Sequence, residues 1–298
     1  MSRIPPQPAP YRARLVPAVL LCVVASAASL ARAADAGAPV DGEAFVEARV
    51  AGRPLPVLSA SGSVVSVEQA YALQDRVEAR LLAQGDRRAG YKLGFTSAAA
   101  RERFRVPGPV RGFLLESMSA PPGRAVSPAG YTRIFAEAEI AFRMGRRLDR
   151  AVADPDALRP FVASVHPAIE LADYRFGADA APGMLDFIAD GVGARGFVLG
   201  PGRDPAGIDL AACAAVFERD GQVVGRGLGA DALGDPWRAL AWLANDLVAH
   251  GRALEPGDVV LTGALGPVQV VAPEAAPTDL RVRIEGVGDV EAAFSRLP

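Results

Sequence analysis

The sequence has very little of three residue types on which many sites depend. Its 298 residues include two cysteines, two histidines and one lysine, although lysine and arginine together number 32. Zinc sites are usually built from several cysteines and histidines, so a usual zinc set is excluded. The formal net charge of −2, with arginines scattered along the chain, gives no support for a nucleic-acid partner.

The single lysine stands in an unusual setting. Lys92 lies within Gly90-Tyr91-Lys92-Leu93-Gly94, whereas every other basic residue is arginine. The arginine excess itself is attributed to codon usage and says nothing about function. A lysine ammonium is compact and can lose its proton when buried, whereas arginine stays charged. We therefore predict a functional lysine here; the alternative is a chance surface residue.

The first 33 residues are typical of a secretory signal peptide. Three arginines precede an apolar run from Leu15 to Leu30, and an Ala-Arg-Ala cleavage site follows it. The run is shorter than the roughly 20 residues of a spanning helix, so we predict cleavage after Ala33 rather than a membrane anchor. A periplasmic or secreted protein would result. Cys213 would then be the only cysteine, which excludes an intrachain disulfide.

Hydrophobic periodicity predicts an α+β fold. A helix is expected from the capping residue Ser66 to Gly85, and a second from Asp235 to Gly251. Elsewhere short apolar segments separated by glycine and proline indicate strands, and in the segment 134–144 every second residue, from Ile134 to Met144, is apolar and shares one face. Many strands with few helices favour a mixed or antiparallel sheet over a doubly wound parallel sheet.

Three glutamates form the main candidate for a site. Glu137 and Glu139 share the face of the alternating strand opposite its apolar residues, with Cβ atoms about 7 Å apart. A solvated strand face would explain this pair by itself. Glu170, between Ile169 and Leu171, is harder to explain in that way, because an isolated buried carboxylate is costly. Three carboxylates suit a hard divalent cation such as Mg²⁺ or Mn²⁺.

These residues lie in segments that resemble a known family. Residues 90–97, GYKLGFTS, are similar to the G-x-K-[IL]-G-x-T-S segment of the 2-keto-4-pentenoate hydratases and oxo-acid decarboxylases of the fumarylacetoacetate hydrolase superfamily. Residues 135–139 resemble the E-x-E metal motif of that family, residues 167–170 its third ligand segment, and residues 257–263 its closing segment. The resemblance runs from about residue 67 to residue 298.

The resemblance implies a mixed β-roll with a small N-terminal helical lobe. After the signal peptide at 1–33, residues 34–90 would form a lead-in and the lobe, and residues 91–298 the catalytic domain. The family also implies a homo-oligomer with no membrane partner after signal cleavage. Its cofactor would be Mg²⁺ or Mn²⁺, held by Glu137, Glu139 and Glu170, and its substrate a small 2-oxo or 2-hydroxydienoic acid.

Further roles follow from the same resemblance. Lys92 would assist proton transfer or stabilise the developing enolate. Asp173 is a candidate from the residues alone and not from the resemblance: the segment Asp173-Tyr174-Arg175 favours a structural ion pair, and the catalytic alternative is that Asp173 orients Lys92 or a metal-bound water. The residues predicted to bind substrate are Gly94, Thr96, Arg175, Thr262 and Gly263.

Three activities remain open at this point. The leading hypothesis is a hydratase of 2-hydroxydienoic or 2-oxo-enoic acids. The first alternative is a decarboxylase of a related dicarboxylic oxo-acid, and the second is a non-catalytic periplasmic protein that binds oxo-acids. The sequence departs from the family at Val110-Arg111, where an aspartate is common, and at Gly191, where asparagine is typical.

Overall fold

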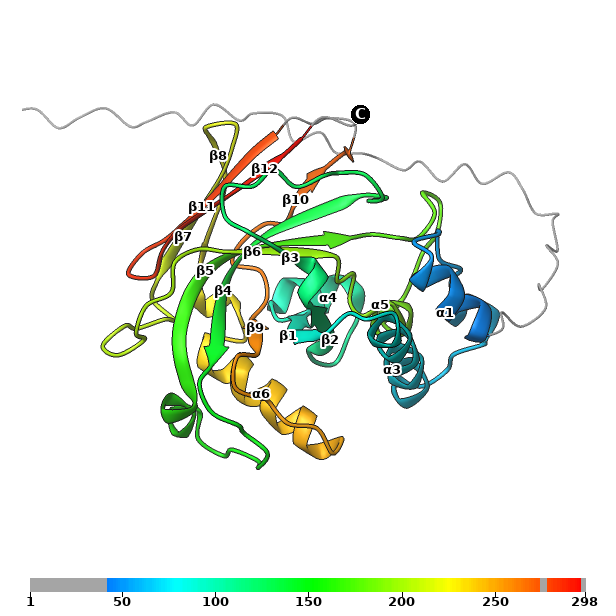
Figure 1. Cartoon of the computed structure of the whole chain (residues 1–298), viewed down its shortest axis with the longest axis horizontal. Helices are drawn as coiled ribbons and strands as arrows, with labels where there is room; N and C mark the ends of the chain where they lie inside the picture. The colour runs from blue at the N-terminus through cyan, green and yellow to red at the C-terminus, as the bar shows by residue number, and fades with distance from the viewer. Residues whose placement is uncertain (1–41, 274–277, 296–298) are drawn as a thin grey trace, which may run out of the picture. The chain divides into compact units, whose positions relative to one another are not determined.

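The alternating strand predicted at 134–144 is the centre of the fold. In the computed structural model it is β4 (Ile134–Met144), in the middle of the larger sheet (Figure 1). The six apolar residues of its predicted inward face are each at most 2% exposed. β4 pairs with the antiparallel β5 (Val162–Asp173) along almost its whole length, which places Glu137 directly opposite Glu170.

The strands form two sheets. The larger has the order β2-β1-β9-β4-β5-β6-β3, with β10 also paired to β4, and the smaller has the order β12-β11-β7-β8. Among the named strands the pairs β1–β9 and β3–β6 are parallel and the others antiparallel, as expected for the predicted mixed sheet. The remaining strands are β1 (Arg88–Gly94), β2 (Val110–Leu115), β3 (Ser119–Ala120), β6 (Gly196–Leu199), β7 (Ala214–Arg219), β8 (Gln222–Leu228), β9 (Val259–Leu261), β10 (Gln269–Val271), β11 (Thr278–Ile284) and β12 (Gly288–Phe294).

Both predicted helices are observed with their predicted caps. The Ser66 hydroxyl accepts a hydrogen bond from the Gln69 amide at 3.2 Å, and the Asp235 carboxylate accepts one from the Trp237 amide at 2.9 Å. Three short helices, α2, α4 and α5, did not show in the periodicity. The α-helices are α1 (Gly42–Val50), α2 (Leu58–Ser61), α3 (Val67–Ala83), α4 (Ala98–Phe104), α5 (Met184–Asp190) and α6 (Pro236–Ala249).

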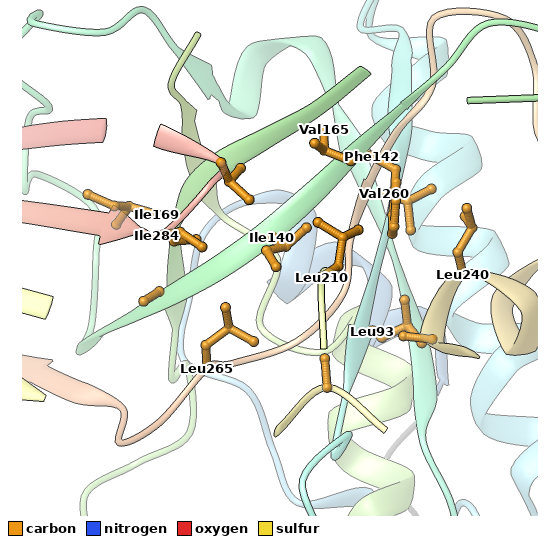
Figure 2. Packing of buried hydrophobic residues seen from close by; sticks show 14 of the residues in the cluster. Leu93, Ile140, Phe142, Val165, Ile169, Leu210, Leu240, Val260, Leu265 and Ile284 are labelled. Carbon is orange, nitrogen blue, oxygen red and sulfur yellow. The ribbon is translucent and has the colours of Figure 1, made fainter. Parts of the chain in front are cut away.

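Two clusters of buried apolar side chains hold these elements together. One joins the inward face of β4 to α6 and to the smaller sheet, and Figure 2 shows Ile140, Leu240 and Ile284 within it. The other joins the N-terminal helices and α5 to β1 and β2, with Phe45 and Phe113 among its buried residues. Burial of this apolar surface is the main contribution to stability, since no disulfide is available in the described residues.

A buried ion network fixes α1 to the segment that follows α5. Arg49 Nε lies 2.7 Å from an Asp190 carboxylate oxygen, and Arg49 Nη2 donates to the Ala194 carbonyl at 2.9 Å. Arg175 Nη1 donates to both oxygens of the same aspartate, at 3.0 and 3.1 Å. Burial and the neighbouring Arg175 lower the pKa of Arg49 to about 10. The N-terminal helices are therefore bound to the part of the chain that lines the site.

The structure describes residues 42–273 and 278–295, which belong to one compact unit, Gly37–Pro298. The predicted signal peptide at 1–33 and its cleavage after Ala33 lie outside the described residues. Within the described ranges, every helix is too short or too polar to cross a membrane. The predicted lobe at 34–90 contains α1, α2 and α3. Its predicted boundary at residue 90 lies inside β1, and the division into two domains stays a prediction.

Candidate active site

Three glutamate side chains meet at one point between β4 and β5. Ligand oxygens of Glu137, Glu139 and Glu170 all lie within 4.8 Å of one another. Glu137 faces Glu170 across the two strands, and Glu139 projects from the same face because it follows Glu137 at a spacing of two. Glu139 and Glu170 are fully buried, whereas Glu137 is half-buried. The structure thus brings together the three glutamates that the sequence predicted, and Glu137 is the one that solvent can reach.

The electrostatics of this set favour a cation. Burial and the charge of Glu170 raise the pKa of Glu137 to about 7, and the same causes raise the pKa of Glu139 well above its usual range. Glu139 Oε1 and Glu170 Oε2 are buried and have no hydrogen-bond partner. Buried carboxylate oxygens without partners are costly unless a cation neutralises them. The three residues therefore fit a hard divalent metal, which takes oxygen ligands.

Lys92 is the cation that the protein itself supplies. Its side chain is 3% exposed, and its Nζ atom donates to Glu170 Oε1 and, at 2.9 Å, to the Val192 carbonyl. Burial lowers the pKa of Lys92, but the charges of Glu170, Glu137 and Glu139 outweigh it and the pKa is raised. The three glutamates therefore oppose the loss of the proton that burial alone would favour, and they favour the ammonium form of Lys92.

The carbonyl that holds Lys92 comes from a strained turn after α5. Gly191, Val192 and Gly193 have φ angles of 81°, 58° and 71°. A positive φ is easy for glycine but costly for a β-branched residue, and such strain is found mainly where function needs it. A Cβ on Gly191 would lie 2.9 Å from the Phe113 ring, so the asparagine typical of the family would not fit here without a shift. No side-chain pattern in the sequence indicated this carbonyl.

Thr96 and Gly263, both predicted to bind substrate, lie against each other beside Glu139. The Gly263 amide donates to Glu139 Oε2 at 2.7 Å. Position 263 requires glycine for two reasons. Its φ is +103°, and a Cβ added there would lie 2.0 Å from Thr96 Oγ1. The amide thus orients Glu139, and substrate binding by Thr96 and Gly263 stays a prediction.

Gly94 and Thr262 support the site through the backbone. A Cβ on Gly94 would lie 2.4 Å from Val192 Cγ1, so glycine here lets the strained turn pack onto β1. The Thr262 hydroxyl is fully buried and donates to the Ile140 carbonyl at 2.8 Å, which ties the chain after β9 to β4. For both residues these contacts indicate support, and substrate binding by them stays a prediction.

Asp173 and Arg175 are fully occupied with structural partners. Asp173 Oδ1 accepts from the amides of Thr132 and Arg133 at 2.8 and 3.1 Å, and Asp173 Oδ2 lies 3.4 Å from Arg175 Nε. Both side chains are 2% exposed. The contacts of Asp173 include neither Lys92 nor the glutamates among the described residues. The structural ion pair named as the alternative is therefore observed, and a catalytic role of Asp173 and substrate binding by Arg175 stay predictions.

Arg111 belongs to Val110-Arg111-Gly112, where relatives often have aspartate, an aromatic residue and glycine, and it has a structural role. It is 1% exposed, forms an ion pair with Asp246, and lies over the Tyr71 ring at 4.0 Å from the centroid. Its backbone carbonyl accepts from Gln74 Nε2 at 3.0 Å. Arg111 therefore helps to pack α3 and α6 against β2, and the fold accommodates this departure from the family pattern.

Comparison with solved structures identifies the class of fold to which the protein belongs. The fold is similar to that of 4-oxalocrotonate decarboxylase from Pseudomonas putida G7, complexed with magnesium and adipate, with a TM-score of 0.79 and 27% sequence identity; the match covers 85% of this chain and 95% of that one. The predicted α+β fold with a curled mixed sheet of the fumarylacetoacetate hydrolase type is thereby confirmed.

The chain belongs to the fumarylacetoacetate hydrolase family. Residues 95–295 match the family described as Fumarylacetoacetate (FAA) hydrolase C-terminal. 2-Keto-4-pentenoate hydratase 2 of Dechloromonas aromatica (strain RCB) is 36% identical over 261 residues, which are 87% of this chain and 98% of the relative. 2-Hydroxyhexa-2,4-dienoate hydratase of Comamonas testosteroni is 35% identical over 257 residues, covering 85% and 96%. These relatives are hydratases, and the chain is an enzyme of that lyase class.

Proposed function

We propose that the protein is a metal-dependent hydratase that adds water to a small 2-hydroxydienoic or 2-oxo-enoic acid. One observation carries this proposal: three carboxylates meet beside a buried ammonium, and two of their buried oxygens have no partner. The names of the relatives, 2-keto-4-pentenoate hydratase and 2-hydroxyhexa-2,4-dienoate hydratase, support the substrate class.

Mg²⁺ or Mn²⁺ is the cofactor that suits these residues. Glu137, Glu139 and Glu170 would hold it, and all three offer the hard oxygen ligands that these ions prefer. When bound, a divalent ion supplies Lewis-acid stabilisation of negative charge on a substrate oxygen. The magnesium in the similar decarboxylase structure supports this choice.

The protein's own residues then provide position and a proton. Lys92 Nζ donates to Glu170 Oε1, so it lies where it can donate a hydrogen bond or a proton to an oxygen or carbon that becomes negative beside the carboxylates. Val192 keeps that ammonium in place, and the Gly263 amide fixes Glu139. Burial of Glu139 and Glu170 excludes bulk water, which strengthens each of these interactions.

The test is an assay of the purified protein with Mg²⁺ or Mn²⁺ and 2-hydroxypenta-2,4-dienoate. Ultraviolet absorbance of the diene should fall in wild type, and Glu139→Gln should lose this activity together with Mn²⁺ binding. Glu291→Gln, an exposed carboxylate on β12, is the matched control and should behave as wild type. Metal-dependent binding without loss of absorbance would contradict the proposal and indicate the non-catalytic alternative.

Decarboxylation is the second candidate, because the similar solved structure is a 4-oxalocrotonate decarboxylase. It is distinguished by its product. A dicarboxylic oxo-acid substrate would release CO₂, whereas hydration gives a hydroxylated oxo-acid with no loss of carbon. Assaying both substrates with the same metal-loaded protein decides between the two activities.

We also propose that the protein is exported after cleavage following Ala33 and assembles as a homo-oligomer. The sequence of residues 1–33 supports export, and the family resemblance supports assembly. Amino-terminal sequencing of the secreted protein and light scattering of the purified protein test these two points.

A further inference from the structure

Five phenylalanines and one tyrosine form a continuous series of ring contacts beside the three glutamates. We call this cluster the aromatic wall. The chain contains only 12 phenylalanines and five tyrosines, so their gathering in one place calls for an explanation. Neighbouring ring centroids lie between 5.3 and 6.1 Å apart. The aromatic wall consists of Phe95, Phe104, Phe135, Tyr174, Phe176 and Phe187.

The aromatic wall is connected to the site at three points. Phe135 precedes Glu137 by two residues on β4, so its ring projects from the face that carries the carboxylates. Phe95 follows β1, which carries Lys92. Phe187 accepts a hydrogen bond through its carbonyl from the Val192 amide at 2.7 Å, and Val192 in turn holds Lys92. The wall is therefore connected to the elements that carry Glu137 and Lys92.

The aromatic wall differs from an ordinary core cluster in its exposure. Phe176 is fully buried, but Phe95, Phe135, Tyr174 and Phe187 are half-buried, and Phe104 is 40% exposed. Apolar surface left accessible beside a polar site is typical of ligand-binding sites.

The backbone at Phe95 gives independent evidence. Its φ of +55° is a left-handed conformation that a bulky side chain rarely adopts. Its carbonyl accepts from Arg101 Nη1 at 3.1 Å, which helps to hold this conformation. A large ring retained in a strained conformation beside a site indicates a functional requirement for that ring.

The wall offers an acid tail no hydrogen-bond partner. The polar atom in its rings, the Tyr174 hydroxyl, donates to the Ala180 carbonyl at 3.3 Å. Two arginines reach the wall through cation–π contacts, Arg133 at 5.3 Å from the Tyr174 centroid and Arg103 at 5.5 Å from that of Phe104. The rings themselves would not replace the hydration that a carboxylate loses against them, and the two guanidiniums near them are placed over ring faces. An apolar, unsaturated or aryl tail would instead bury surface against them.

We propose that the aromatic wall binds the substrate tail and selects acids with an apolar tail over acids with a second carboxylate. This inference rests on the proposed function, because the wall meets the tail only when the acid end lies at Glu137, Glu139 and Glu170. It assigns the tail subsite to Phe135 and Tyr174 first, since these two rings are linked directly and Phe135 neighbours the carboxylates along β4.

The test uses saturated 2-oxo acids, which bind without being hydrated. Calorimetry with the Mg²⁺-loaded protein would compare 2-oxobutanoate, 2-oxohexanoate, 2-oxo-4-phenylbutanoate and 2-oxoadipate. We expect 2-oxohexanoate to bind about tenfold more tightly than 2-oxobutanoate, from the burial of two further methylene groups, and the phenyl acid more tightly still. 2-Oxoadipate should bind no more tightly than 2-oxobutanoate.

Variants locate the effect. Phe135→Ala and Tyr174→Ala should bring the affinity ratio of long to short acids close to one. Phe135→Leu keeps the bulk of the side chain and replaces Phe135→Ala in the test if the alanine variant does not fold. Phe161→Ala is the matched control, because Phe161 is another half-buried ring that contacts Arg150 outside the wall. It should leave the ratio unchanged.

The outcomes separate the two proposals. If 2-oxobutanoate binds only with metal but tail length has no effect, or 2-oxoadipate binds most tightly, the wall is not the tail subsite and the proposed function stands. If none of the acids shows metal-dependent binding, the proposed function itself is wrong and the inference fails with it.

Discussion

The protonation of Lys92 is determined by its neighbours more than by its burial. An amine in an apolar interior tends to be neutral, but three carboxylates around this one raise its pKa. The ammonium is bonded to Glu170, one of the residues expected to hold the metal. Lys92 therefore has two effects in this arrangement: it is a proton donor at the site, and its positive charge opposes a second cation nearby.

Replacing Lys92 with methionine should separate these effects. We expect Lys92→Met to reduce kcat by about 10²–10⁴-fold, the usual contribution of a positioned acid or base. We expect the affinity for Mn²⁺ to stay the same or to increase, because the competing positive charge is gone. Mn²⁺ titration by calorimetry and steady-state assays measure the two quantities. A joint loss of metal binding and activity would show instead that Lys92 only maintains the structure of the site.

His166 should make the stability of the fold depend on pH. Its Nδ1 atom lies 2.9 Å from the Gly200 carbonyl and its Nε2 atom 2.8 Å from the Ser164 hydroxyl, so the neutral ring has partners for both nitrogens. Burial lowers the pKa of His166. In the unfolded chain a histidine has a pKa of about 6.5, so below that pH the unfolded state binds more protons than the folded state.

Stability from His166 is therefore complete above pH 6.5 and is lost as the pH falls through the lowered pKa of the folded state. Urea unfolding of wild type and His166→Gln at pH 7.5 and pH 5.5 measures this contribution, because the raised pKa values of Glu137 and Glu139 act in the opposite sense in both proteins. On acidification the wild type should lose more stability, or gain less, than His166→Gln. An equal difference in both proteins would mean that other groups cause the acid destabilisation.

At the level of single residues, sequence reasoning could identify side chains but not backbone partners. Glu170 and Lys92 were found because a carboxylate in an apolar strand and a single lysine between glycines are unusual. Val192 could not be found, because a carbonyl is common to every residue and only its φ of 58° makes it special. For the same reason the hydrogen bond from the Gly263 amide to Glu139 could not be predicted.

Among the elements, the register of β4 against β5 creates the carboxylate set. Alternation places Phe135, Glu137 and Glu139 on one face, and the antiparallel register brings Glu170 opposite Glu137. The chain after β9 then adds Gly263 from the other edge of β4. The geometry of the site therefore depends on a close approach at Gly263.

Gly263→Ala should disrupt this approach, since the new Cβ would lie 2.0 Å from Thr96 Oγ1. We expect loss of Mn²⁺ binding and activity, with a destabilisation of about 1–3 kcal/mol or more from the backbone and the clash. Gly85→Ala is the matched control, with a φ of +99° but no atom within 4 Å of its Cβ. It should lose stability only. Equal behaviour of the two variants would show that the contact with Thr96 is unimportant.

Element length explains which elements the sequence could predict. β4 has 11 residues and α3 has 17, enough to show a clear period of two or 3.6, and both were predicted. The helices α4 and α5 have seven residues each, only about two turns, and their apolar residues show no distinct stripe. Yet α5 leads into the turn that holds Lys92.

At the scale of the whole molecule, metal binding should be coupled to folding. Without a cation the folded state contains carboxylates whose pKa values are raised by burial and mutual repulsion, and this opposes folding at neutral pH. A ligand that binds only the folded state stabilises it, by about 2.7 kcal/mol at a concentration 100 times Kd.

We therefore expect Mg²⁺ or Mn²⁺ to raise the melting temperature and EDTA to reverse the effect. Glu139→Gln should melt higher than metal-free wild type, because one repelling charge is removed, and should show little response to metal. Differential scanning calorimetry with and without EDTA measures both. A variant that responds to metal as wild type does would exclude Glu139 as a ligand.

The overall fold class followed from the sequence, but the strand order did not. Alternation indicates that a segment is a strand and which face is buried, and it contains no information about its neighbours. β9 shows this most clearly. Its three residues pair in parallel with β1 and antiparallel with β4, although both partners precede it by more than a hundred residues.

The position of β9 also determines when the site can form during synthesis. Lys92 and the three glutamates have all left the ribosome well before Val259–Leu261 is added, but the strand that joins β1 to β4 is still missing. Pairings between distant segments form late in folding, because the intervening chain must first be ordered. A nascent chain that ends before β9 would thus contain every charged group of the site without the sheet that aligns them, and the ion could bind only after this strand is added.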